Sequence, residues 1–212
     1  MTGPTEPGGA DSSRARAART KRARSREKLL EAGGRLFRER GWLGTRMEDI
    51  AREAGLSPAT AYNHFESKHH LIAVVYAPVF APLLDYAEEA IAAGGPVVDA
   101  LHDVVLQAAR LARREQHLTI ALMTAVMEAT NKVGMPVSLN DPRVLVPFPR
   151  PVHALIAEGQ RRGELLPVLD ADDAAAFITN AMLLRVLSRP AESAEKTAEL
   201  TLTFLLGALA PR

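Results

Sequence analysis

Three side chains within residues 42–68 are of types that bind nucleic acids or phosphate. Lys68 follows Ser67, a residue that commonly caps helices, so a helix dipole, free backbone N–H groups and an ammonium would converge on one anion. The guanidinium of Arg46 can bind guanine bidentately or bind a phosphate, and a solvated surface arginine is an equally good explanation. The amide of Asn63 suits the edge of adenine. These residue types point to anion and base binding.

The elements around these residues have the pattern of a helix, a tight turn and a second helix. Apolar residues recur with helical spacing between residues 47 and 54, and Thr45 with Glu48 has the spacing of a capping box. Gly55 ends this helix, and Ser57–Pro58 is typical of the start of the next. A preceding helix, from about residue 25, packs against both. The sequence therefore predicts a helix-turn-helix unit.

The outward face of the short helix after Ser57 has small or amide side chains, namely Ala59, Thr60 and Asn63. Small side chains fit the thymine methyl group, and asparagine pairs with adenine. We expect at least one of the three to contact a base directly.

Charge is distributed unevenly along the 212 residues. Residues 1–70 contain 14 Lys and Arg against 9 Asp and Glu, a net charge of +5, whereas residues 71–212 have a net charge of −4. A basic first third on an acidic remainder indicates a small anion-binding head on a separate body, with nucleic acid the leading candidate. Residues 1–22 are expected to form a disordered basic arm, either a solvated tail or a contact to phosphates.

Beyond the head, the chain has helical spacing and no convincing strand. The longest apolar run, residues 71–84, is shorter than the roughly 20 residues of a membrane span, and Pro78 and Pro82 should break or kink its helix. Five more prolines fall in residues 134–151. The expected fold class is all-α: an N-terminal three-helix helix-turn-helix domain followed by an all-helical ligand-binding and dimerisation domain. The expected boundaries are 1–22 for the arm, 23–68 for the head and 69–212 for the body.

Several kinds of chemistry are excluded by the sequence. It contains no cysteine, which rules out disulfides, thiolate metal sites and a cysteine nucleophile. It has no Gly-rich phosphate loop, no Gly-x-Ser-x-Gly motif and no His-Glu-x-x-His motif. His69 and His70 are adjacent, so they diverge by about 100° on a helix and do not form one metal site. We therefore expect no enzyme activity, no cofactor and no metal.

The DNA-binding domain of the tetracycline-repressor (TetR) family is similar to residues 41–68, GWLGTRMEDIAREAGLSPATAYNHFESK. The shared pattern is a Gly-aromatic pair, a Thr cap, Ile-Ala, Ala-Gly-Leu-Ser, Tyr-x-His-Phe and Ser-Lys, and the similarity covers about residues 25–75. It implies a regulator, usually a repressor, that binds a palindromic operator as a homodimer and binds a small molecule in its body. The chain departs from the pattern at Arg46, where many members have Thr or Ser, and at Ala59 and Ala61, where many have Gly and a larger apolar residue.

By the same resemblance, the Tyr62 hydroxyl would donate to a DNA phosphate, and His64 would contact DNA from the end of the same helix. The alternatives are a tyrosine ring that only packs and a histidine that only closes the helix. Thr45 is expected to cap its helix and to add a phosphate contact. The candidate DNA-binding residues are Thr45, Arg46, Ala59, Thr60, Tyr62, Asn63, His64 and Lys68.

In the body, the prolines should leave gaps between helices, and a gap lined by methionine, aromatic and a few polar side chains would suit a mostly apolar ligand. At helical spacing, however, such residues more often form ordinary core. The candidate ligand-binding residues are Tyr86, Met123, Met127, Phe148, His153 and Asn180.

The last two helices, residues 170–188 and 193–209, have apolar residues over more of their circumference than one core needs. We expect them to pair with the same helices of a second subunit. Within the first of them, the side chains expected to point inward are Phe177, Ile178, Ala181 and Leu184.

The expected function is that of a cytoplasmic DNA-binding regulator that is released from its operator by a small ligand and has no membrane partner. A constitutive DNA-binding protein without an effector is the alternative. A ligand that shifts the melting temperature separates the two.

Overall fold

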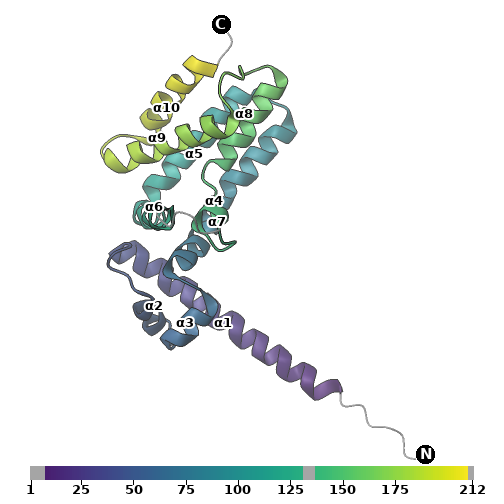
Figure 1. Ribbon diagram of the computed structural model, residues 1–212, viewed down its shortest axis with the longest axis vertical. Coiled ribbons are helices and arrows are strands. Elements are labelled where there is room, and N and C mark those ends of the chain that lie inside the picture. Colours follow the sequence, from purple (N-terminus) through teal and green to yellow (C-terminus); the bar gives the residue numbers. More distant parts are fainter. Residues whose placement is uncertain (1–7, 131–136, 210–212) are drawn as a thin grey trace, which may run out of the picture.

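The computed structural model describes residues 8–130 and 137–209, which form ten α-helices without a strand (Figure 1). This confirms the prediction of an all-α fold with an N-terminal helix-turn-helix. The helices are α1 (Gly8–Arg40), α2 (Met47–Glu53), α3 (Pro58–His64), α4 (Lys68–Ala93), α5 (Val97–Arg114), α6 (Gln116–Thr130), α7 (Pro142–Leu145), α8 (Arg150–Arg162), α9 (Ala171–Ser188) and α10 (Ala194–Leu209).

The head consists of the C-terminal half of α1 with α2 and α3, and local signals set its helix ends. Gly41 and Gly55 have φ angles of 65° and 66°, a left-handed conformation that ends α1 and follows α2. The Ser57 hydroxyl accepts a hydrogen bond from the Thr60 N–H and caps α3. A Cβ on Gly33 would lie 2.5 Å from the Leu71 side chain, so this glycine allows α1 to approach α4 closely.

The first helix is much longer than expected, because it begins at Gly8 rather than near residue 25. The basic arm predicted to be disordered over residues 1–22 is therefore helical from residue 8 onward, and residues 1–7 lie outside the described residues. Residues 10–32 contain no glycine or proline and are rich in alanine and arginine, which favour helix. In Figure 1 this half of α1 extends beyond the head, away from the body.

Helix α4 connects the head to the body and continues without a break through both Pro78 and Pro82, where a break or a kink was expected. Packing against α1, α5, α6, α7 and α8 stabilises the helix despite the missing N–H groups. By length and composition α4 could cross a membrane, but it buries Leu71, Ile72 and Phe80 inside the protein, as a core helix does.

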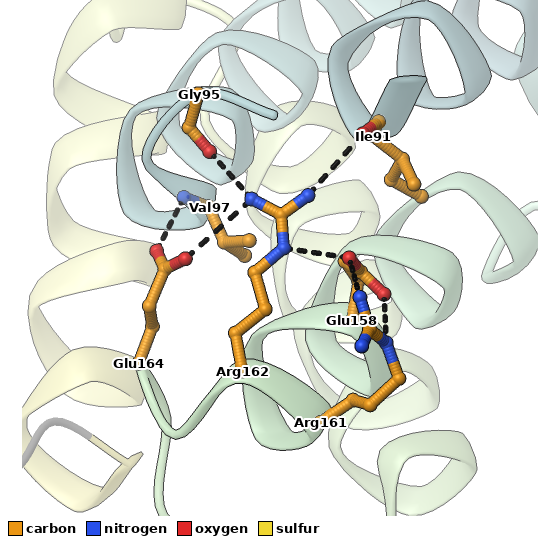
Figure 2. Close-up of polar contacts among 7 residues, drawn as sticks. All are labelled: Ile91, Gly95, Val97, Glu158, Arg161, Arg162 and Glu164. Atoms are coloured by element: carbon orange, nitrogen blue, oxygen red, sulfur yellow. Dashed lines mark hydrogen bonds and ion pairs between the residues drawn. The ribbon is translucent and has the colours of Figure 1, made fainter. Parts of the chain in front are cut away.

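The body is a bundle of α4 to α10 around one apolar core that is continuous with that of the head. Arg162, at the end of α8, fastens this helix to the end of α4 (Figure 2). Its guanidinium donates to the carbonyl oxygens of Gly95, at 3.0 Å, and Ile91, at 3.2 Å, and to the Glu158 carboxylate at 2.6 Å. The guanidinium thus binds one carbonyl in the last turn of α4, which also accepts from the Gly94 N–H, and one in the loop after it.

Candidate nucleic-acid interface and ligand cavity

The outward face of α3 presents the residues expected to contact bases. Ala59, Tyr62 and Asn63 are exposed, and Thr60 is half-buried. The Thr60 hydroxyl lies 2.9 Å from that of Ser57, and the Tyr62 hydroxyl donates to Glu48 of α2 at 3.4 Å. Burial and the Glu48 carboxylate raise the pKa of Tyr62, so its hydroxyl remains a donor. The exposed Asn63 side chain makes no hydrogen bond with another described residue.

Thr45 is the candidate whose placement differs most from the prediction. It is fully buried, and its hydroxyl donates to the carbonyl oxygens of Leu36, at 3.2 Å, and Gly41, at 2.8 Å. The N-cap of α2 is Arg46, whose N–H donates to the Asp49 carboxylate at 3.3 Å. The expected Thr45 cap is therefore wrong, and its hydroxyl cannot face a phosphate, because it satisfies carbonyls at the end of α1 instead.

The Lys68 side chain also bonds groups within the head. Its ammonium donates to the carbonyl oxygens of Trp42, at 2.8 Å, and Thr45, at 3.0 Å, and lies 3.8 Å from the centre of the Trp42 ring. Burial is the main cause of its lowered pKa. The Ser67 cap of α4 is as expected, but the side chain after it holds the α1–α2 loop rather than an open anion site. Arg46, by contrast, is exposed.

His64, at the end of α3, is half-buried beside the first helix. Burial and the nearby Arg22 and Arg26 guanidinium groups lower its pKa, so the imidazole is neutral near pH 7. The Arg26 guanidinium lies 5.1 Å from the centre of the Phe65 ring. Two arginines of α1 therefore lie beside the C-terminal end of α3, the helix with the candidate base contacts.

A polar cluster joins the head to α6 of the body. Glu128 of α6 accepts a hydrogen bond from the Trp42 indole N–H at 2.8 Å, and its second oxygen lies 2.9 Å from His69 Nε2. The bond from Trp42 is the main cause of the lowered pKa of Glu128. Trp42 lies in the loop before α2, so Glu128 bonds α6 to this loop, and Lys68 bonds the start of α4 to the same residue.

The body contains a small cavity of about 20 Å³ between α4, α5, α9 and the start of α8 with the segment that precedes it. Its wall is apolar except for two groups. The Tyr76 hydroxyl shares a hydrogen bond of 2.9 Å with Thr119, and burial raises the pKa of Tyr76 to about 12. The side-chain oxygen of Thr179 is buried and has no hydrogen-bond partner among the described residues. An unpaired buried hydroxyl beside an apolar cavity is a ready contact for a ligand.

Of the six candidate ligand residues, Phe148 lines this cavity and the other five do not. Met127 is 65% exposed, and Asn180 faces solvent. Tyr86 donates to Asp103 at 3.0 Å, outside the cavity. Met123 packs partly buried against the core, and the remaining candidate, His153, is half-exposed with its ring 3.3 Å from the Asp172 carboxylate.

Tyr76, Phe80 and Thr179 line the cavity but are not among the candidate ligand residues identified from the sequence. Tyr76 and Phe80 contact the Phe148 ring edge-on, with ring centres 5.7 and 5.4 Å apart. The available signal was a tyrosine within the most apolar segment of the chain, since a buried hydroxyl needs a partner. Thr179 gave no comparable signal, because threonine in a helix commonly bonds its own backbone.

The outer face of α9 and α10 is apolar. Phe177, Leu184 and Phe204 are 72%, 69% and 79% exposed, and they line one groove together with Ile178 and Leu205. The inward orientation expected for Phe177, Ala181 and Leu184 is wrong, and that expected for Ile178 is confirmed. Ala174, Ile178 and Met182 occupy the buried side of α9.

Comparisons with known proteins agree with this architecture. The family model for bacterial regulatory proteins of the tetR family matches residues 29–75. The HTH-type transcriptional regulator BetI of Rhizobium meliloti (strain 1021) is 30% identical over 180 residues, covering 83% of this chain and 85% of that protein. Thermus thermophilus FadR, solved with lauroyl-CoA, has a TM-score of 0.70 at 21% identity, covering 88% of this chain and 96% of its own. Bacillus subtilis FadR, solved with stearoyl-CoA, has a TM-score of 0.65 at 17% identity, covering 84% and 96%. The chain belongs to the TetR family of DNA-binding transcriptional regulators.

Proposed function

We propose that this protein is a cytoplasmic repressor that binds an inverted-repeat operator as a homodimer and is released by a mostly apolar ligand. The observation that supports the proposal most strongly is the exposed face of α3, where Asn63 and Ala59 lie at the outer surface of a capped helix. Asn63 would bond adenine, Thr60 and Ala59 would contact a neighbouring base, and Tyr62, His64 and Arg46 would contact phosphates. The proposed head comprises residues 23–68, preceded by the basic half of α1.

Homodimerisation would use the apolar face of α9 and α10. Seven residues of α3 span only a few base pairs, so specificity requires two heads, with half-sites about 34–36 Å apart or a multiple of that. Three large apolar side chains exposed on two adjacent helices are unfavourable in water and self-complementary under a two-fold axis. A second copy of the chain is therefore the proposed occupant of this face.

The proposed effector site is the cavity beside Thr179. Its present volume holds about one water molecule, so a larger ligand must separate α4, α8 and α9. Its apolar wall and unpaired hydroxyl fit an apolar ligand with one hydrogen-bonding group. Two structural relatives were solved with acyl-CoA molecules, so acyl-CoA compounds are the first ligands to test.

Two routes connect this cavity to the head. Helix α4 contains Tyr76 and Phe80 at the cavity and begins at Lys68, which holds the α1–α2 loop. Helix α6 contains Thr119, bonded to Tyr76, and Glu128, bonded to Trp42. A ligand that moves either helix would change the spacing of the two heads. A coupling free energy of about 1–3 kcal/mol would alter operator affinity about five- to 150-fold.

The test is selection of binding sites from random duplex DNA by the full chain. We expect an inverted repeat, and we expect Asn63→Ala to relax the preference at one position of each half-site by about 1–3 kcal/mol. Val144→Ala, on the exposed face of α7, is the control and should recover the wild-type site. Recovery of no preferred sequence would contradict the proposal.

The effector is tested with compounds that raise the melting temperature. Such a compound should weaken operator binding, and operator should weaken its binding by the same factor. Binders that leave operator affinity unchanged would favour the alternative, a constitutive DNA-binding protein.

A further inference from the structure

The N-terminal half of α1 is an exposed, strongly basic helix that the helix-turn-helix does not require. Between residues 14 and 28 the chain has eight Lys and Arg and a single acid, Glu27. Every side chain from residue 14 to 24 is exposed. No ion pair with another described residue neutralises these charges. The basic residues are Arg14, Arg16, Arg19, Lys21, Arg22, Arg24, Arg26 and Lys28.

These charges lie on two faces of the helix, both beside the helix-turn-helix. Lys21, Arg24 and Lys28 are spaced by three and four residues, so they share one face, and they line an open groove that ends at Leu56 in the turn before α3. Arg22 and Arg26 lie on another face, next to His64 at the end of α3. The basic surface is therefore continuous with the candidate base-contacting helix.

The direction of α1 places this surface beyond the head. Figure 1 shows the N-terminal half of α1 extending past α3, on the side away from the body. From Arg24 to Arg14 a helix rises about 15 Å, at 1.5 Å per residue. Along one DNA strand, about 15 Å corresponds to four or five phosphates at 3.4 Å spacing.

We propose that residues 14–28 form a second phosphate-binding surface, which contacts the DNA backbone outside the bases contacted by α3. This inference rests on the proposed function and extends it, because the operator then includes flanking DNA whose presence matters and whose sequence does not. Positive charge without acidic partners suits phosphates, and the exposed helix has few apolar side chains that would favour a protein partner or a lipid interior.

The test compares two duplexes with the same selected operator. One ends at the outermost base of the preferred sequence, and the other has about eight additional base pairs of arbitrary sequence at each end. The proteins are the wild type, the triple variant Arg14→Gln, Lys21→Gln, Arg24→Gln, and a control with the same loss of charge on the exposed surface of the body. The control substitutions are Arg114→Gln, Arg150→Gln and Lys196→Gln, all at exposed residues outside the groove of α9 and α10.

We expect the wild type and the control to bind the longer duplex more tightly, and the triple variant to lose most of that advantage. If the three residues of both protomers each neutralise one phosphate, the advantage of the longer duplex should shrink about 10³-fold between 50 and 200 mM salt. Tight, selective binding of the short duplex without any effect of length would overturn this inference and leave the proposed function standing. An equal loss on both duplexes would overturn it as well. A lack of selective binding to either duplex would overturn both proposals.

Discussion

Removing the Phe204 side chain should dissociate the proposed dimer without unfolding the protomer. This side chain is 79% exposed on α10, so the fold of one chain gains little from it. In a two-fold interface it would be buried twice, once from each protomer. Full burial of a phenylalanine contributes about 1.5–3 kcal/mol, so Phe204→Ala should weaken the dimer by about 3–6 kcal/mol.

That free energy corresponds to a dimer dissociation constant raised about 10²- to 10⁴-fold. Sedimentation velocity over a concentration series measures the constant, and thermal unfolding checks that the protomer stays folded. Leu139→Ala is the matched control, because Leu139 is 83% exposed but lies before α7, away from α9 and α10. A variant that associates as strongly as the wild type would refute the assignment of this face.

The remaining predictions concern the cavity, the α8 cluster and the contact between head and body. Thr179→Val removes a buried hydroxyl without a described partner, so the melting temperature should rise while affinity for any effector falls. Hydrogen bonds from Arg161 and then Arg162 lower the pKa of Glu158 to about 2, so the carboxylate stabilises the fold above about pH 4.5 and loses that effect as the pH falls towards 2. Melting temperatures recorded against pH should therefore fall less steeply in acid for Glu158→Gln than for the wild type. Glu128→Ala removes the bonds from α6 to Trp42 and His69. Because the Glu128 side chain is half-exposed, the substitution should lower the free energy of unfolding by only about 1 kcal/mol. The effect of an effector on operator affinity, measured by fluorescence anisotropy, should shrink.

Local residue chemistry was sufficient to predict most of the head. Gly41, Ser57 and Ser67 each determine a helix end through their own backbone or hydroxyl, so neighbouring residues were enough to locate these ends. Thr45 failed as a cap because its hydroxyl bonds carbonyls at the end of α1. Such a contact between two elements cannot be recognised from the spacing of neighbouring residues.

Five of the six candidate ligand residues lie outside the cavity, because residue type does not fix which side of a helix faces inward. Helices α4, α6 and α9 have apolar residues on most sides, so their spacing alone does not distinguish the core from a subunit interface. Met127 and Phe177 have large apolar side chains, as core residues do, and yet both are exposed. Thr179, a small polar residue, lies at the cavity instead.

The number of protomers on the selected operator tests the central claim most directly. Native mass spectrometry of the full chain with that duplex gives the stoichiometry, and a duplex with one half-site scrambled is the comparison. We predict two protomers on the intact inverted repeat and a large loss of affinity when either half-site is scrambled. One protomer on the intact site, with unchanged affinity for the half-scrambled duplex, would contradict a homodimer that contacts two half-sites through α3.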